Sequence, residues 1–246
     1  MDNLNNIYGK SFNYKGILLY PIKMENVMNF YENVDCLLIN KNEIKDVDII
    51  RMSYFEFLLE YNCHQPELKL ITKLRNLFEL VLLNKSFEIC KDKNGSFCFT
   101  IGEKLFYAND FDAIKKIIFN QNLIRYTDEI LSEEFKEALK ETEAFLSAKN
   151  EPATIEERII SYHCETGITY DDIEKLTIYQ FNKGLERLNL IESFRIYTYP
   201  AIKSGEGDKI PHWLSHIPEK GVYDDITMSM DELSKTTGDS DIFASS

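Results

Sequence analysis

The chain has 246 residues, of which 44% are hydrophobic and 13% aromatic, enough to bury a core in one large domain or two small ones. Its net charge of -13 predicts a surface that repels phosphate backbones and anionic lipids, so we expect neither a nucleic-acid nor a membrane partner. The N-terminus lacks a signal-peptide pattern, and no apolar run approaches the roughly 20 residues of a membrane span. We therefore expect a folded cytoplasmic protein.

In the first third of the chain, the sequence pattern predicts a short strand followed by helices. Residues 17–21 are brief, apolar and ended by proline, which is typical of a strand. Helical spacing of apolar residues follows over residues 24–38, over residues 46–61 and from Pro66 to Leu82. On the first two of these helices we expect the following core residues: Met24, Val27, Met28, Tyr31, Val34, Leu37, Leu38, Ile49, Ile50, Ser53, Tyr54, Phe57, Leu58 and Tyr61.

The hydrophobic period changes within residues 86–107. Three short segments there alternate between apolar and polar side chains, and the first two flank the hairpin signal Lys93-Asn94-Gly95. A three-residue loop with Gly95 in the left-handed region would place Cys90 opposite Cys98. We therefore predict a small antiparallel meander that carries two free thiols.

Two more helices precede a linker. One covers residues 109–122 and is capped by Asn109 or Asp110, and a charged one covers residues 132–147. The most linker-like interior run is residues 148–153. These patterns place a domain boundary near residue 150.

Beyond the linker the sequence predicts a compact helical unit. Thr154-Ile-Glu-Glu is a capping-box pattern that opens a helix, and Gly167 ends it. A short helix begins at Thr169 and a long one at Thr177. The order of these helices suggests a helix-turn-helix regulator as a less favoured alternative, because acids offset the basic and amide candidates for DNA contact, which are Gln180, Lys183, Arg187 and Arg195.

We predict a mainly α fold with one small antiparallel β meander, in the α+β class. Residues 1–148 form a helical domain that contains the meander, and residues 149–217 form a C-terminal helical unit with an aromatic segment. Residues 218–246 are expected to be a flexible acidic tail, because they are rich in acids and poor in large apolar groups.

No constellation in the sequence points to catalysis or to a metal. His212 and His216 are four residues apart, as in zinc hydrolases, but Trp213 stands where that mechanism needs a glutamate. The dipeptides Cys63-His64 and His163-Cys164 match no common zinc module, and five cysteines leave one over after any full pairing. We expect reduced thiols, no cofactor, no metal and no enzymatic activity.

Aromatic residues gather near the end of the long helix, on both sides of a stretch that contains proline and glycine. A helix cannot readily continue through that stretch. Because Trp, Tyr and Arg dominate binding hot spots, we predict a partner-binding segment formed by Arg195, Tyr197, Tyr199, Trp213 and Leu214. The alternative is that these side chains fold back over the C-terminal helices.

Three motifs follow one another from Tyr170 onward: Y-x-x-[IV]-x-x-[ML]-[ST]-x-x-x-[FY], then L-x-R-[IL]-N, then [IL]-x-x-W. The residues that carry them or flank them are Tyr170, Ile173, Leu176, Phe181, Leu185, Arg187, Leu188, Asn189, Ile196, Tyr197 and Trp213. This order resembles proteins of the tail-assembly module of tailed bacteriophages from low-GC Gram-positive hosts.

The resemblance implies a non-enzymatic assembly chaperone in the host cytoplasm. Its expected partners are other tail proteins, such as the tape-measure, tube or baseplate proteins, or a second copy of itself. The alternative within the same group is a structural component that remains in the tail or baseplate of the virion.

Overall fold

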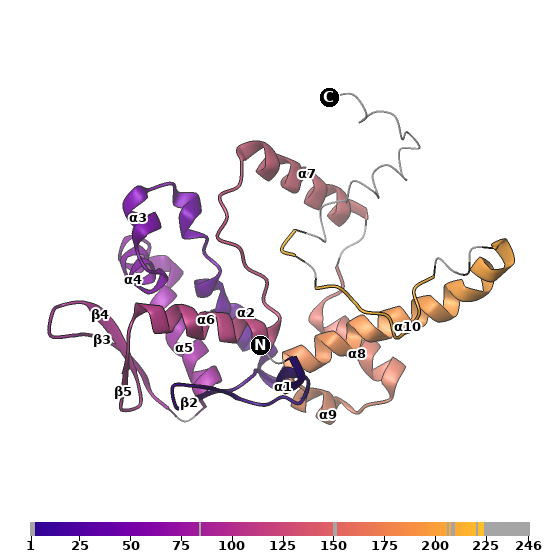
Figure 1. The fold of residues 1–246 in the computed structure, drawn as a ribbon, viewed down its shortest axis with the longest axis horizontal. Coiled ribbons are helices and arrows are strands. Elements are labelled where there is room, and N and C mark those ends of the chain that lie inside the picture. Colours follow the sequence, from indigo (N-terminus) through magenta and orange to yellow (C-terminus); the bar gives the residue numbers. More distant parts are fainter. Residues whose placement is uncertain are drawn as a thin grey trace.

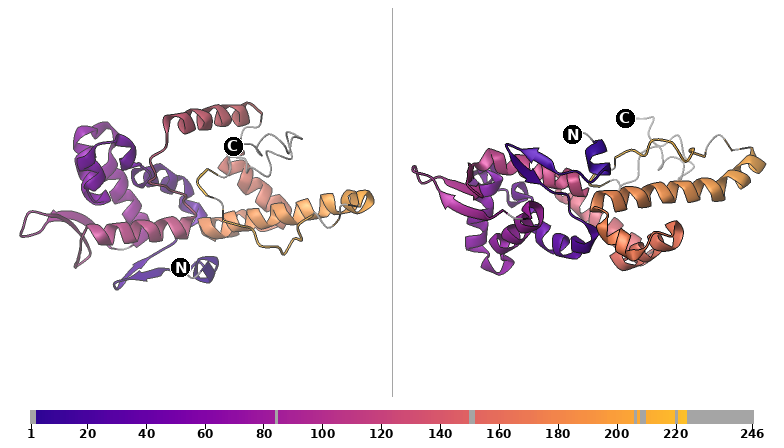
Figure 2. Two further views of the ribbon diagram at one scale, coloured as in Figure 1. Left: turned by 45° about the horizontal axis from the view of Figure 1, so that its top comes forward. Right: turned by 90° about the horizontal axis from the view of Figure 1, so that it is seen from below.

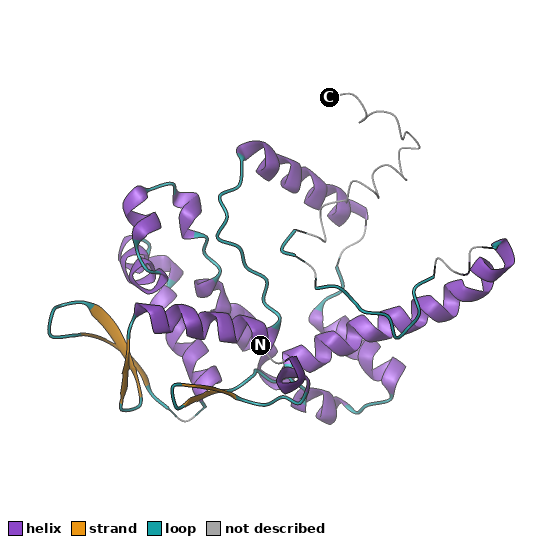
Figure 3. Ribbon diagram, viewed as in Figure 1, coloured by secondary structure: helices purple, strands orange, loops and turns teal. Residues whose placement is uncertain are grey.

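The computed structural model describes residues 3–83, 85–149, 152–205, 207, 210–219 and 221–223. The fold is mainly helical with two small antiparallel sheets, which confirms the predicted class (Figure 1, Figure 3). The α-helices are α1 (Asn3–Ile7), α2 (Val27–Val34), α3 (Val47–Arg51), α4 (Tyr54–His64), α5 (Leu70–Leu82), α6 (Ala108–Asn122), α7 (Glu133–Lys149), α8 (Ile155–Thr166), α9 (Tyr170–Lys175) and α10 (Ile178–Ser204). Short 3-10 turns are η1 (Met24–Asn26), η2 (Asp35–Leu37), η3 (Lys41–Ile44) and η4 (Pro66–Leu68).

The predicted meander is confirmed. Strands β3 (Phe87–Lys91), β4 (Phe97–Ile101) and β5 (Lys104–Phe106) form an antiparallel sheet in that order. Gly95 has a φ of 84° in the loop, and Cys90 lies opposite Cys98 as two free cysteines. The predicted strand at residues 17–21 is β2 (Ile17–Leu19), and its partner β1 (Phe12–Tyr14) was missed.

The helix predicted over residues 46–61 is wrong as one continuous element. It divides into α3 and α4, because Ser53 adopts an extended backbone at the start of α4. The Ser53 hydroxyl oxygen accepts from the Glu56 N–H at 3.2 Å, and the Glu56 carboxylate accepts from the Ser53 N–H at 3.3 Å. This capping box was readable in the sequence, but the continuous apolar spacing concealed it.

Helix α6 begins earlier than predicted, because Tyr107 rather than Asn109 or Asp110 occupies its N-cap position. The Asp110 carboxylate instead accepts from the Tyr107 N–H at 3.0 Å, from the Tyr14 hydroxyl at 2.8 Å and from Lys15. Burial alone would raise the pKa of Asp110, but these hydrogen bonds outweigh it and hold the pKa below its ordinary value. Asp110 therefore joins the β1–β2 hairpin to the first turn of α6.

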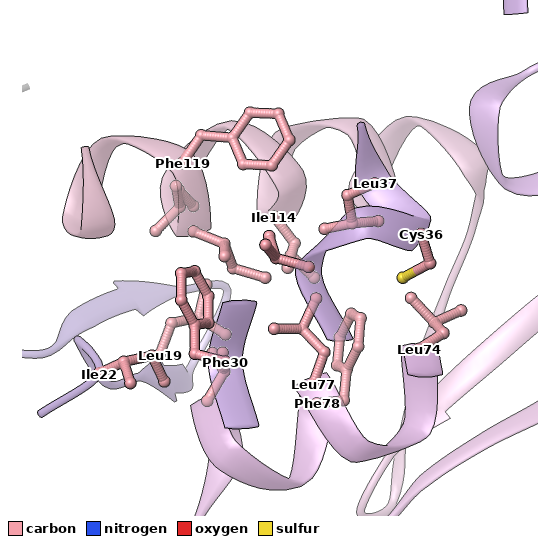
Figure 4. Close-up of a cluster of buried hydrophobic side chains, with 14 of the residues drawn as sticks. Leu19, Ile22, Phe30, Cys36, Leu37, Leu74, Leu77, Phe78, Ile114 and Phe119 are labelled. Carbon is pink, nitrogen blue, oxygen red and sulfur yellow. The ribbon is translucent and has the colours of Figure 1, made fainter. Parts of the chain in front are cut away.

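The core is one contiguous cluster built around phenylalanine rings (Figure 4). Two predictions on its helical faces are wrong, because Met28 and Ile50 are exposed. Phe30 in α2 and Phe55 in α4 are fully buried and were missed, although each lies three or four residues from a predicted core position.

The segment around Ile22 links the N-terminal and C-terminal parts of the chain. The Met24 N–H donates to the Leu176 carbonyl at 2.8 Å, and the Ile178 N–H donates to the Ile22 carbonyl at 2.8 Å. The Ile22 N–H in turn donates to Oδ1 of Asn122, at the end of α6, at 3.0 Å. These bonds hold the start of α10 against the helices of the first half.

Side chains from both of the main predicted regions share the core. Ile173, Ile178 and Phe181 belong to the same buried cluster as Phe30 and Ile114. The domain boundary near residue 150 stays a prediction, and residues 150 and 151 themselves lie outside the described part of the chain. The acidic tail predicted at residues 218–246 also lies almost wholly outside it.

Candidate functional site

Helix α10 has two different halves. At its start, the Thr177 hydroxyl oxygen accepts from the Gln180 N–H at 3.1 Å, and Ile178, Tyr179 and Phe181 are buried. From residue 191 to residue 204 no side chain is buried. This second half, called the outer arm below, projects beyond the other helices (Figure 1, Figure 2).

The prediction that the chain leaves the helix near Pro200 is wrong, because α10 continues through Pro200 to Ser204. A proline inside a helix removes one backbone hydrogen bond, here the one to the carbonyl of residue 196. The outer arm is exposed, so water can reach that carbonyl and reduce the cost. The helix ends instead at Gly205, which has a φ of 76°.

One face of the outer arm carries three large apolar side chains. Ile196, Tyr199 and Ile202 are 60%, 66% and 63% exposed, and their spacing of three residues makes them neighbours along the helix. Arg195 lies beside them and forms an ion pair with Glu192 at 2.5 Å. Lys203 adds a second cation, with its ammonium 4.6 Å from the ring centroid of Tyr199.

A second face is built from α10 and the non-helical segment at residues 210–219. The Arg187 guanidinium donates to the Trp213 carbonyl at 2.7 Å and to the Ser215 carbonyl at 3.0 Å, which fixes this segment along the helix. The rings of His212 and Phe194 lie 5.2 Å apart. Trp213 therefore lies on the side of α10 that carries Phe194.

The five predicted partner-binding residues thus divide between two faces. Tyr197 and Tyr199 are two positions apart, which separates them by about 200° around a helix. Tyr197 is one turn beyond Phe194, so it belongs with Trp213 and Leu214, whereas Arg195 belongs with Tyr199. Ile196 and Ile202 were not among the predicted binding residues, because the segment was interpreted as non-helical and their helical spacing with Tyr199 was therefore not considered.

The histidines near the outer arm are not arranged as a metal site. His212 and His216 lie in a non-helical segment, and the Leu214 N–H donates to Nδ1 of His212 at 3.2 Å. His163 donates from Nδ1 to the Ile168 carbonyl at 2.7 Å and stacks on Tyr170. Among the described residues, no group of three or more His, Cys, Asp or Glu side chains could hold a metal ion.

The side chains that a helix-turn-helix would use for DNA have partners within the protein. Gln180 accepts from the Thr177 N–H and donates to the Ile7 carbonyl, both at 2.8 Å. Lys183 pairs with Glu186 at 2.8 Å. Arg187 and Arg195 are engaged as described above, so each of these four side chains has a partner within the chain.

A polar groove of about 1300 Å³ lies between α6, α8 and α10. Arg158 from α8 reaches across it to the side-chain oxygen of Asn182 on α10. Small-molecule sites are mostly apolar with a few convergent polar groups, and this groove lacks that character. The outer arm is therefore a stronger candidate for a functional site than this groove.

Residues 147–218 match a family model described as the YomV second domain, which belongs to a phage-derived family. The match covers α8, α9, α10 and the segment that carries Trp213, and therefore all five predicted partner-binding residues. The match spans less than a third of the chain, so only this region is shown to be similar to that family. Comparisons with curated proteins and with solved structures gave no significant match. In the described residues, every helix falls short of what crossing a bilayer would require.

Proposed function

We propose that this chain is a non-enzymatic phage tail assembly protein that binds another tail protein through the outer arm and Trp213. One observation carries the proposal: half of α10 has no core to cover, yet it exposes Ile196, Tyr199 and Ile202 side by side. Contiguous exposed apolar surface of this kind marks protein interaction sites. The similarity to a phage-derived family lies over the same region and supports a phage partner.

The expected mode of binding is a helix in a groove. In this mode the apolar face of a helix enters a hydrophobic groove of the partner, with anchors spaced about one turn apart. Ile196, Tyr199 and Ile202 fit that spacing, and Trp213 and Leu214 would contact a second wall of the partner. The partner is accordingly a tail protein that exposes an apolar groove before the tail is complete.

The test is association with co-produced tail proteins, measured by co-purification and by titration calorimetry. Tyr199→Ala or Trp213→Ala should weaken binding by about 2 kcal/mol, or about 30-fold in Kd, because buried aromatic anchors contribute most to such interfaces. Tyr8→Ala is the matched control, since Tyr8 is also a tyrosine with 66% exposure but lies outside the arm. It should bind like the unaltered chain.

Unchanged affinity in both arm variants would reject the proposal. A loss of affinity that is matched by an equal loss of folding stability would also reject it, because the residues would then serve only the fold. Association of the chain with itself in sedimentation experiments, abolished by Tyr199→Ala, would replace the tail protein with a second copy as the partner.

A structural component of the virion is the second candidate. A chaperone would act in the host cytoplasm and cover apolar surface transiently, whereas a virion component would keep a permanent, larger interface. Mass spectrometry of purified virions separates these roles. Absence of the protein from virions supports the chaperone, and a fixed copy number supports the structural component.

A further inference from the structure

Cys90 and Cys98 face each other across the β3–β4 hairpin, which extends away from the helices (Figure 1). Directly opposed residues of an antiparallel pair have Cα atoms about 4.5 to 5.5 Å apart, which lies within the range that a disulfide spans. The two Sγ atoms are 3.1 Å apart. A disulfide bond is about 2.05 Å long, so a shift of about 1 Å would bring the sulfurs to bonding distance. The hairpin therefore holds two reduced thiols in a geometry that permits a bond between them.

The thiol pair lies on the face of the sheet that is turned away from the core. Successive side chains of a strand point to opposite faces, so Cys98 points away from the side on which Phe99 lies. The described core cluster includes Phe99 and Ile101 of β4 but not Cys98. A bond between the two sulfurs can therefore form without moving the packed rings of the core.

The two thiols differ in their access to solvent. Cys98 is fully buried, whereas Cys90 is partly exposed. Burial, and next to it the hydrogen bond with Cys90, raises the pKa of the Cys98 thiol to about 11, so Cys98 stays protonated near neutral pH. A small oxidant consequently meets Cys90 first. Cys98 then lies directly beside the oxidised sulfur, in the position of a resolving thiol.

We propose that Cys90 and Cys98 form a reversible redox site, which hydrogen peroxide oxidises to a disulfide and a dithiol reduces again. The Cys90 thiolate attacks one oxygen of the peroxide, and the other oxygen leaves and takes up a proton to become water. The Cys98 sulfur then attacks the sulfenic acid at Cys90. The oxygen of that acid leaves as a second water, with the proton of the Cys98 thiol. Each sulfur gives up one electron in total, and the peroxide accepts both.

The disulfide would fix the register of β3 on β4. A slip of one residue would place the two cysteines on opposite faces of the sheet, which the bond forbids. It would also close a short loop, because only seven residues separate Cys90 from Cys98. The outer arm of α10 lies at the other end of the molecule (Figure 1, Figure 2). Oxidation of the hairpin is therefore independent of the proposed tail-protein interface.

The experiment treats the reduced full chain with hydrogen peroxide, then unfolds it and alkylates the remaining thiols with iodoacetamide. The number of alkylated cysteines should fall from five to three, and dithiothreitol should restore all five. Trypsin can cleave after Lys91 and Lys93, which separates the two cysteines into different peptides. Mass spectrometry without reductant should find these peptides linked, at about 2 Da below the sum of their masses, because two hydrogens are lost.

Cys98→Ser removes the resolving thiol, so a sulfenic acid should accumulate at Cys90 and react with dimedone. The unaltered chain should show little of this label. Cys164→Ser is the matched control, because Cys164 is exposed and lies outside the hairpin, and it should form the disulfide like the unaltered chain.

Equal dimedone labelling of Cys90 in the unaltered chain and in Cys98→Ser would overturn the proposal. Links that involve Cys63 or Cys164 and form as readily as the one between Cys90 and Cys98 would also overturn it. Peptide mapping of the unaltered chain decides the matter even if Cys98→Ser fails to fold.

Discussion

Aromatic side chains are arranged in opposite ways in the core and on the outer arm. In the core, the ring of Phe99 lies 5.2 Å from that of Phe55 and 5.9 Å from that of Phe111, and all three are buried. On the outer arm, Tyr197 and Tyr199 are mostly exposed. The first region obtains its packing partners from within the chain. The second has apolar surface to cover and no part of the described chain that covers it, which is why we assign it to a partner.

The largest effect should come from breaking the core side of this comparison. Phe99→Ala should destabilise the fold by about 3 to 5 kcal/mol, because it leaves a cavity among packed rings. Urea unfolding followed by circular dichroism measures this. Phe97→Ala is the control on the same strand, since Phe97 is 37% exposed, and it should cost much less. Equal losses in the two variants would mean that the core is not organised around Phe99.

An intermediate effect on folding stability should come from Lys115, which aromatic rings surround in the core. Because burial lowers the pKa of Lys115 from 10.5 to about 7 in the folded chain, the unfolded chain binds the extra proton between these values. Stability should therefore rise with pH across that window. Between about pH 7 and pH 9, the free energy of unfolding of the unaltered chain should rise by about 2 kcal/mol more than that of Lys115→Met. Urea unfolding at both values measures the difference, and parallel profiles would show that Lys115 titrates normally.

The smallest effect should come from the outer arm itself. Ile202→Ala should change the free energy of unfolding by no more than about 0.5 kcal/mol, because this side chain is exposed and touches no core. Ile178→Ala, at the buried start of the same helix, should cost about 2 to 5 kcal/mol. Thermal melts compare the two variants directly. A large loss from Ile202→Ala would mean that the arm is packed in solution and is unsuited to a partner.

Local signals made much of the C-terminal half predictable. Thr154, Gly167 and Thr177 each mark a helix end through a cap that depends on neighbouring residues alone, and all three are where the structure places them. The meander was predictable for the same reason, since its period and its turn are local. The faces of the outer arm could not be predicted, because they depend on whether α10 continues through Pro200.

The burial of Lys115 among aromatic rings could not be predicted from sequence. A lysine in a helix is ordinarily solvated, and only the tertiary fold shows that Tyr54, which lies far away in the chain, covers this one. The predicted partner-binding residues were chosen by residue type, whereas their division between two faces required the course of α10 and the contacts of Arg187.

The hydrogen bonds that join residues 22–24 to residues 176–178 also bear on how the chain is made. On the ribosome, residues 22–24 emerge early, but their backbone partners at residues 176–178 follow only after more than half of the chain has been synthesised. Until then this edge of the first half stays open, and contacts between such distant residues form slowly. The outer arm follows those backbone partners within the same helix, α10. Synthesis of α10 therefore supplies first the residues that join the two halves of the fold and then the arm that we propose as a binding surface.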